Sequence, residues 1–144
     1  MACDFPSTEV LAAVEATSLV CEIELLETAI CTARENVELL VRLGELYSRS
    51  GRIREGLAVD LRLVTLAPRD PIVLYNLACS FSLWGKPETA LRMLELSLEF
   101  GYDDEGHLVR DPDLANVREL ACFDEFLIRL RTRSLARDLR AERP

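Results

Sequence analysis

The sequence has few of the residues on which metal sites and disulfide frameworks depend. His107 is the only histidine, Lys86 is the only lysine, and the five cysteines include no Cys-x-x-Cys pair. A structural zinc site needs clustered sulfur and nitrogen ligands, and a disulfide framework needs paired cysteines, so both are disfavoured. We expect reduced, mostly buried thiols, no metal site and no cofactor.

Motifs that would support catalysis are also missing. No serine, cysteine or histidine motif accompanies His107 to make it a general base. The sequence has no glycine-rich phosphate loop. The acidic residues between positions 103 and 113 lack the alternating spacing and the distal glutamate of a calcium loop. We therefore expect that the protein is not an enzyme. A pocket that joins His107 and Cys79 would revive the enzyme alternative.

Long apolar runs are absent as well. No stretch of about eighteen apolar residues occurs, so the sequence predicts no membrane span. The first residues lack a basic start followed by a long apolar run, which is the pattern of a secretory signal. We expect a cytoplasmic protein that has no membrane partner.

Charge is unevenly distributed along the chain, which has a net charge of −8. Residues 1–36 hold seven acids against Arg34, whereas residues 129–144 hold six arginines against two acids. The negative overall sign disfavours nucleic acid as a partner. The opposite charges of the two ends suggest a homo-oligomer held end to end, with a solvated, frayed tail as the alternative.

An internal repeat is the clearest signal in the sequence. The motif L-x2-L-G-x2-Y, which begins at Leu40, recurs 34 residues later as L-x2-L-A-x2-F, which begins at Leu74. In the same register, Gly51 corresponds to Gly85. A fixed period of this length is typical of stacked helix pairs, with a small residue such as Gly44 where two backbones approach closely.

The two units resemble the tetratricopeptide repeat, whose pattern is W-x2-L-G-x2-Y, then A-x3-F, then P. They cover residues 37–70 and 71–104, and Leu40, Leu74, Gly56 and Asp60 depart from the pattern. The resemblance implies an all-α fold, a right-handed α-solenoid of stacked helix-turn-helix units within a single domain, 1–144. We expect helices over residues 37–49, 53–66, 72–83 and 87–100, with Asp70 as an N-cap and glycine in each inter-helix turn.

Residues 7–36 come before the clear units and allow two interpretations. Apolar residues recur with nearly helical spacing, and residues 19–34 align with the second helix of a repeat. An eroded repeat would have its turn at residues 16–18. No glycine marks that turn, so one long helix is the alternative.

Residues 105–131 resemble the closing segment found behind bacterial tetratricopeptide repeats, which has the form HL-x2-DPDL-x2-LR. Here Asp111 would be the N-cap and Pro112 would take the first helical position. A capping helix would follow, and an arginine-rich tail would span residues 132–144. The resemblance implies that the segment covers the open end of the stack with the side chains of Leu114, Val117, Leu120, Phe123, Phe126 and Leu127.

The resemblance also implies a role in protein–protein interaction, because the first helix of each pair lines a concave groove in this family. A peptide or helix of another protein would bind in that groove. The alternatives are a small acidic chaperone for a secreted partner, a self-associating structural protein, or groove residues that pack internally or face solvent. By register, the groove residues are Glu38, Val41, Glu45, Ser48, Arg49, Ile72, Tyr75, Asn76, Cys79, Ser82 and Leu83.

Overall fold

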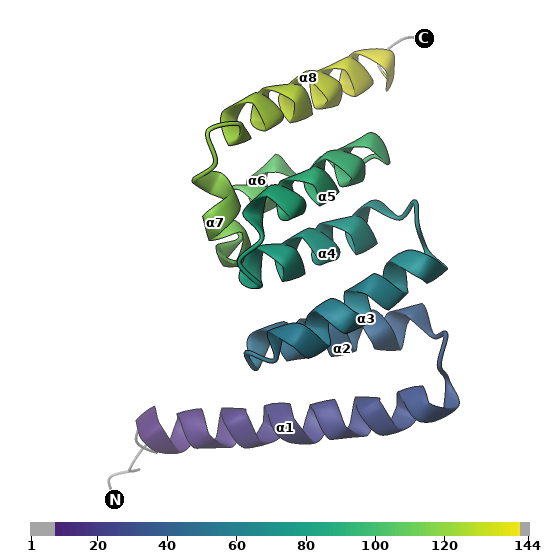
Figure 1. Cartoon of the computed structure of the whole chain (residues 1–144), viewed down its shortest axis with the longest axis vertical. Helices are drawn as coiled ribbons and strands as arrows, with labels where there is room; N and C mark the ends of the chain where they lie inside the picture. Colours follow the sequence, from purple (N-terminus) through teal and green to yellow (C-terminus); the bar gives the residue numbers. More distant parts are fainter. Residues whose placement is uncertain (1–7, 142–144) are drawn as a thin grey trace, which may run out of the picture. The chain divides into compact units, whose positions relative to one another are not determined.

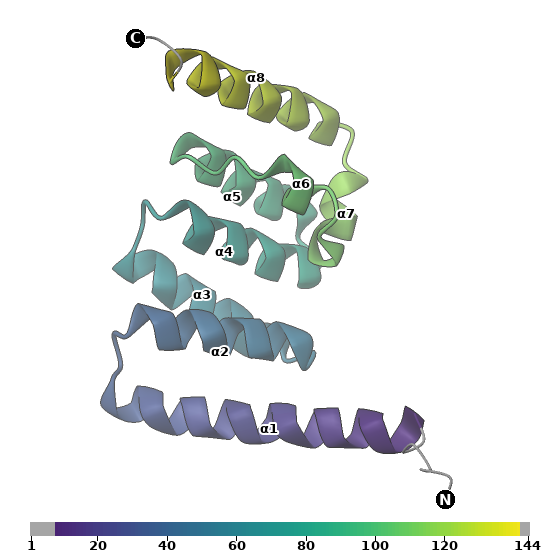
Figure 2. The ribbon, with the colours of Figure 1, turned by 180° about the vertical axis from the view of Figure 1, so that it is seen from behind.

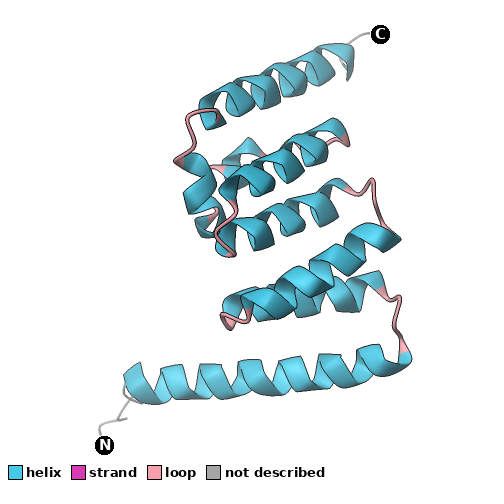
Figure 3. Cartoon of the chain, viewed as in Figure 1, coloured by secondary structure: helices cyan, strands magenta, loops and turns pink. Residues whose placement is uncertain are grey.

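The structure, a computed structural model, describes residues 8–141, and every secondary-structure element in that range is helical (Figure 1, Figure 3). The all-α class expected from the sequence is therefore confirmed. The chain divides into two compact units, Met1–Val59 and Asp60–Pro144. The boundary lies inside helix α3, which spans Ile53–Leu66.

The first unit begins with one long helix, α1 (Thr8–Thr32). Of the two interpretations of residues 7–36, the structure has the single helix; residue 7 lies outside the described range. Residues 16–18 contain neither glycine nor proline, and the Thr17 hydroxyl donates to the carbonyl of Ala13 within the helix, at 2.8 Å. The local sequence therefore offers nothing that ends a helix at this point.

The C-terminal half of α1 lies against α2 (Val37–Arg49). Ile23 and Ile30 of α1 are buried. The Arg42 side chain of α2 donates to Glu22 Oε1, with Nη2 at 2.7 Å, and the Tyr47 hydroxyl donates to Glu27 Oε1 at 2.6 Å. Almost the whole N-terminal half of α1, by contrast, is exposed.

The four helices of the repeat units have nearly the predicted bounds: α2, α3, α4 (Pro71–Leu83) and α5 (Pro87–Glu99). Asp70 is the N-cap of α4 as expected, because its side chain accepts from the backbone N–H groups of Ile72 and Val73. Gly51 and Gly85 have φ angles of 73° and 76°, so each inter-helix turn uses the left-handed conformation that favours glycine.

The close approach expected at Gly44 occurs between α2 and α3. A Cβ atom added to Gly56 would lie 3.4 Å from Tyr47 Cβ and 3.7 Å from the carbonyl oxygen of Gly44. Both glycines are buried. The corresponding residues of the second repeat, Ala78 and Ala90, are fully buried, so both positions hold a small residue in each repeat.

The second unit is layered, with α4, α5 and α8 (Phe123–Ala141) lying one beside the next (Figure 1, Figure 2). Three short elements close one side: α6 (Glu105–Leu108), the 3-10 helix η1 (Pro112–Leu114) and α7 (Ala115–Arg118). Asp111 caps η1 and Pro112 is its first residue, as predicted.

The closing segment forms one core with α4 and α5, as expected. Leu114, Val117, Phe123 and Phe126 are buried in this core, and Leu120 and Leu127 pack against it. The last helix, however, does not end near residue 131 but continues to Ala141. Ion pairs join its later turns to the preceding segment, from Arg131 to Glu105 and from Arg137 to Asp103.

The expectation that the thiols are mostly buried is wrong for the described cysteines. Cys79 is buried, but Cys21, Cys31 and Cys122 are exposed and free; Cys3 lies outside the described residues. The cause is local, because Cys21 and Cys31 lie on faces of α1 that no other helix within residues 8–141 covers. Between residues 8 and 141, no helix combines the length and apolar character that a membrane span requires.

Candidate protein-binding surfaces

The predicted groove residues of α2 remain accessible. Glu38, Glu45 and Arg49 are exposed, and Val41 and Ser48 are half-buried. Glu45 accepts from Arg42 Nη1 at 3.3 Å, an exposed pair along the helix surface. This face therefore presents one half-buried apolar side chain, Val41, among charged and polar side chains.

The predicted groove residues of α4 are mostly covered. Tyr75, Cys79 and Ser82 are buried, so the structure removes them from the accessible groove that the sequence predicts. Asn76 and Leu83 are half-buried, and Ile72 alone of this set is exposed. The covering comes from the chain itself, because η1 and α7 of the closing segment lie on α4.

Two aromatic rings lie against Tyr75 of α4, one just before the closing segment and one within it. The ring of Tyr102 stacks on that of Tyr75, with centroids 4.6 Å apart and planes 11° from parallel. Such offset stacking adds to the free energy gained by burying the rings. The ring of His107 lies 5.4 Å from Tyr75, and His107 itself is exposed.

The Asp111 carboxylate is the polar centre of this contact. Its Oδ2 accepts from the Tyr75 hydroxyl at 2.6 Å and from the Cys79 thiol at 3.6 Å. Its Oδ1 accepts from the backbone N–H of Asp113 at 2.9 Å, which is the capping bond of η1. The residue that caps the closing segment therefore also fastens that segment to α4.

His107 and Cys79, the pair that would revive the enzyme alternative, meet at Asp111. His107 Nε2 lies 3.6 Å from Oδ2, the oxygen that accepts from the thiol. Burial, and then the Asp111 charge, raises the pKa of the Cys79 thiol far above its ordinary value. A nucleophilic cysteine needs the opposite shift, so this arrangement keeps the thiol protonated and unreactive.

The same three register positions differ between the two repeats. Val41, Glu45 and Ser48 of α2 occur 34 residues before Tyr75, Cys79 and Ser82 of α4. On α4 these positions are filled by the chain's own closing segment, whereas on α2 they are half-buried or exposed. The covered face of α4 shows what kind of segment fits such a surface.

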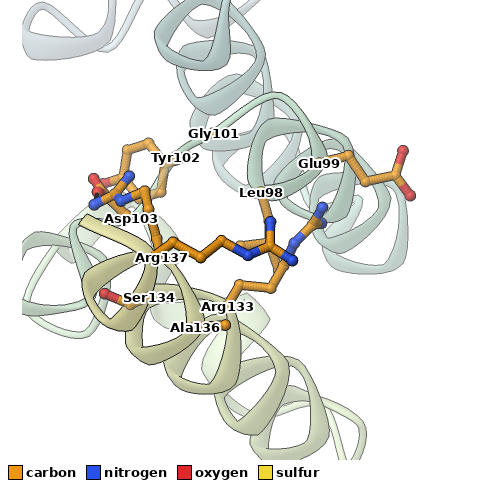
Figure 4. A pocket seen from close by; sticks show the side chains of 10 residues that line it. Leu98, Glu99, Gly101, Tyr102, Asp103, Arg133, Ser134, Ala136 and Arg137 are labelled. Carbon is orange, nitrogen blue, oxygen red and sulfur yellow. Dashed lines mark hydrogen bonds and ion pairs between the residues drawn. The ribbon is translucent and has the colours of Figure 1, made fainter. Parts of the chain in front are cut away.

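A cleft lies between α8 and the turn that follows α5 (Figure 4). This cleft has a volume of about 350 Å³, and its lining includes Arg133, Arg137 and Arg140. Arg137 is paired with Asp103 at the edge of the cleft. Within residues 8–141, neither Arg133 nor Arg140 forms an ion pair.

One buried polar pair was not predicted as a feature of the core. Asp60 of α3 is buried and accepts from the Ser80 hydroxyl of α4 at 2.5 Å. Burial raises the pKa of Asp60 to about 6, although the bond from Ser80 lowers it. The repeat register indicated this position, because Asp60 stands where the family pattern has a large aromatic residue and where the second repeat has the buried Leu94.

Among residues 8–141, no group of three or more histidine, cysteine, aspartate or glutamate side chains is arranged to hold a metal ion. The cluster around Asp111 joins the closing segment to α4 within the chain. The accessible candidates are the exposed face of α2 and the arginine-lined cleft beside α8.

Comparison with known proteins gives one informative similarity. No family model matches the sequence. A 90-residue stretch, 60% of the chain, is 30% identical to a chloroplastic protein of Arabidopsis thaliana and covers 27% of that protein. The chain thus spans about a quarter of the length of this relative, and its membership of the tetratricopeptide family stays a prediction.

Proposed function

We propose that the protein is a non-catalytic protein-binding module, built as a right-handed α-solenoid of tetratricopeptide-like units, that receives a peptide or helix of another protein on α2. The observation that carries the proposal is the difference between the two repeats. The face of α4 is occupied by residues 102–118 of the chain, and the corresponding face of α2 remains accessible.

The closing segment indicates the kind of ligand that this surface accepts. The contact of residues 102–118 with α4 combines the stacked ring of Tyr102 with the carboxylate of Asp111, which accepts from groove side chains. On α2 the corresponding positions are Val41, Glu45 and Ser48. A partner segment with one apolar side chain for Val41 and a basic group for Glu45 fits them.

Affinity capture from the source cell, followed by mass spectrometry, would identify the partner. The test of the site compares the captured partner's affinity for three proteins: the unchanged chain, Val41→Lys, and Leu61→Lys as a control on exposed α3 surface. We expect Val41→Lys to weaken binding by about tenfold or more, as for anchor residues in other interfaces.

Far-UV circular dichroism and melting would show that both variants keep the fold. Equal binding by Val41→Lys and the unchanged chain would refute the α2 site. The absence of any reproducibly retained protein would refute the binding function itself.

A further inference from the structure

Two helix faces expose apolar stripes with the same spacing. The α1 stripe consists of Val10, Val14, Thr17 and Cys21, which recur at intervals of four, three and four residues. The α8 stripe has the same intervals. The α8 stripe consists of Ile128, Thr132, Leu135 and Leu139. Of the eight side chains in the two stripes, five are large aliphatic groups with at least half of their surface exposed.

The α8 stripe lies on a face of α8 that the described residues leave exposed. The opposite face of α8 supplies Phe123, Phe126 and Leu130 to the core. A helix face that no neighbouring repeat covers is normally polar. Here the outer face carries Leu135 and Leu139 at exposures of 62% and 57%. Regular spacing of this kind fits contact with another helix.

The charges around the two stripes are complementary. Helix α1 contains five glutamates and no basic residue. Helix α8 contains five arginines against three acids, and Arg133 and Arg140 form no ion pair within residues 8–141. Pairing two α1 helices or two α8 helices would bring like charges together, whereas pairing α1 with α8 brings opposite charges together.

We propose that the α8 stripe of one molecule binds the α1 stripe of a second copy of the chain, with the two helices antiparallel. The occupant is thus the acidic helix of another identical molecule. This self-association does not depend on the proposed function, because it uses neither the α2 face nor a foreign partner.

The antiparallel register follows from the spacing. It places Val10 against Leu139, Val14 against Leu135 and Cys21 against Ile128, so that the apolar residues meet as in an antiparallel coiled coil. It also brings Thr17 level with Thr132.

The two contacting surfaces are different, so each molecule keeps one free α1 stripe or one free α8 stripe after pairing. A contact of this heterologous type extends into larger assemblies unless the rotation closes a ring. We expect the purified chain to form oligomers that grow with concentration. Because the charges are exposed, raising the salt concentration should weaken the association.

Two double variants test the assignment of the surfaces. Val10→Gln with Val14→Gln removes the α1 stripe, and Leu135→Gln with Leu139→Gln removes the α8 stripe. Glutamine favours helix and all four positions are exposed, so both variants should fold. We expect each variant alone to sediment as a monomer and an equimolar mixture to form a dimer that grows no further.

Other outcomes would overturn the proposal. A dimer that persists in one variant alone would mean that a helix pairs with its own copy. A chain that stays monomeric at every concentration at low salt would mean that the stripes do not associate. Ala12→Gln is the control, because Ala12 is exposed on the opposite face of the same part of α1, and it should leave the oligomers unchanged.

Discussion

The Tyr75 hydroxyl donates a hydrogen bond to the Asp111 carboxylate, at 2.6 Å, across 36 positions of the sequence. This bond joins the first helix of the second repeat to the cap of the closing segment. It explains why residues that belong to a groove by register form part of the core in the structure.

We expect Tyr75→Phe to lower the free energy of unfolding by about 1.5–3 kcal/mol, because the bond has a charged acceptor in a buried place. The stack on Tyr102 would remain. Tyr47→Phe is the matched control, since the Tyr47 hydroxyl donates to the more exposed Glu27. Urea unfolding of both variants measures the difference. An equal loss in the two would mean that the burial of Asp111 adds nothing.

Asp60→Asn should change how stability depends on pH. The folded state holds the proton of Asp60 more tightly than the unfolded state, because the folded pKa is about 6 against about 3.9 for an exposed aspartate. The contribution of Asp60 to stability is therefore full below pH 4 and is lost as pH rises through 6.

We expect Asp60→Asn to raise the free energy of unfolding by up to about 2–3 kcal/mol at pH 8 and by much less at pH 4. Denaturant titrations of the variant and the unchanged chain at the two pH values measure this. A variant that is less stable than the unchanged chain at pH 8 would contradict the raised pKa.

Two substitutions at Gly56 should have opposite effects. Gly56→Ala places its Cβ at ordinary contact distance from Tyr47 Cβ and matches Ala90 of the second repeat. It should be neutral or stabilising by up to about 1 kcal/mol, because alanine favours helix. Gly56→Leu should cost about 1–3 kcal/mol by overpacking against α2. Thermal melts measure both variants. If the leucine variant melts at the same temperature as the alanine variant, the interpretation of a close approach between α2 and α3 is wrong.

The two faces of α8 give another matched pair. Leu130→Ala should cost about 2–5 kcal/mol, because the side chain is fully buried against α5 and the closing segment. Leu135→Ala, five positions later on the exposed face, should change the free energy of unfolding by less than about 0.5 kcal/mol when measured on the monomer. Equal losses would mean that the exposed face is covered within the molecule.

Local signals in the sequence predicted much of the fold. The period of 34 residues, the turn glycines and the caps at Asp70 and Asp111 gave the helix bounds to within one residue across the two repeats. These features depend on neighbouring residues, so a linear pattern contains them. The continuation of α8 past residue 131 was missed because its ion pairs to Glu105 and Asp103 are long-range.

The candidate site was harder to predict for the same reason. The register correctly indicated that Tyr75, Cys79 and Ser82 share one face of α4. It contained no information about which segment covers that face, because the contact is made by Tyr102 and Asp111, which both come after the two helices of the repeat. On α2, where nothing in the closing segment corresponds, the predicted residues stay at the surface.

The reactivity of Cys21 reports whether the α1 stripe is covered. Cys21 is exposed in the monomer, as is Cys31 farther along the same helix. In the proposed register Cys21 is covered by Ile128 of a second molecule, whereas Cys31 lies beyond the end of α8. A thiol-specific dye should therefore react with Cys21 more slowly as the protein is concentrated. The rate at Cys31 should stay unchanged and serves as the internal reference.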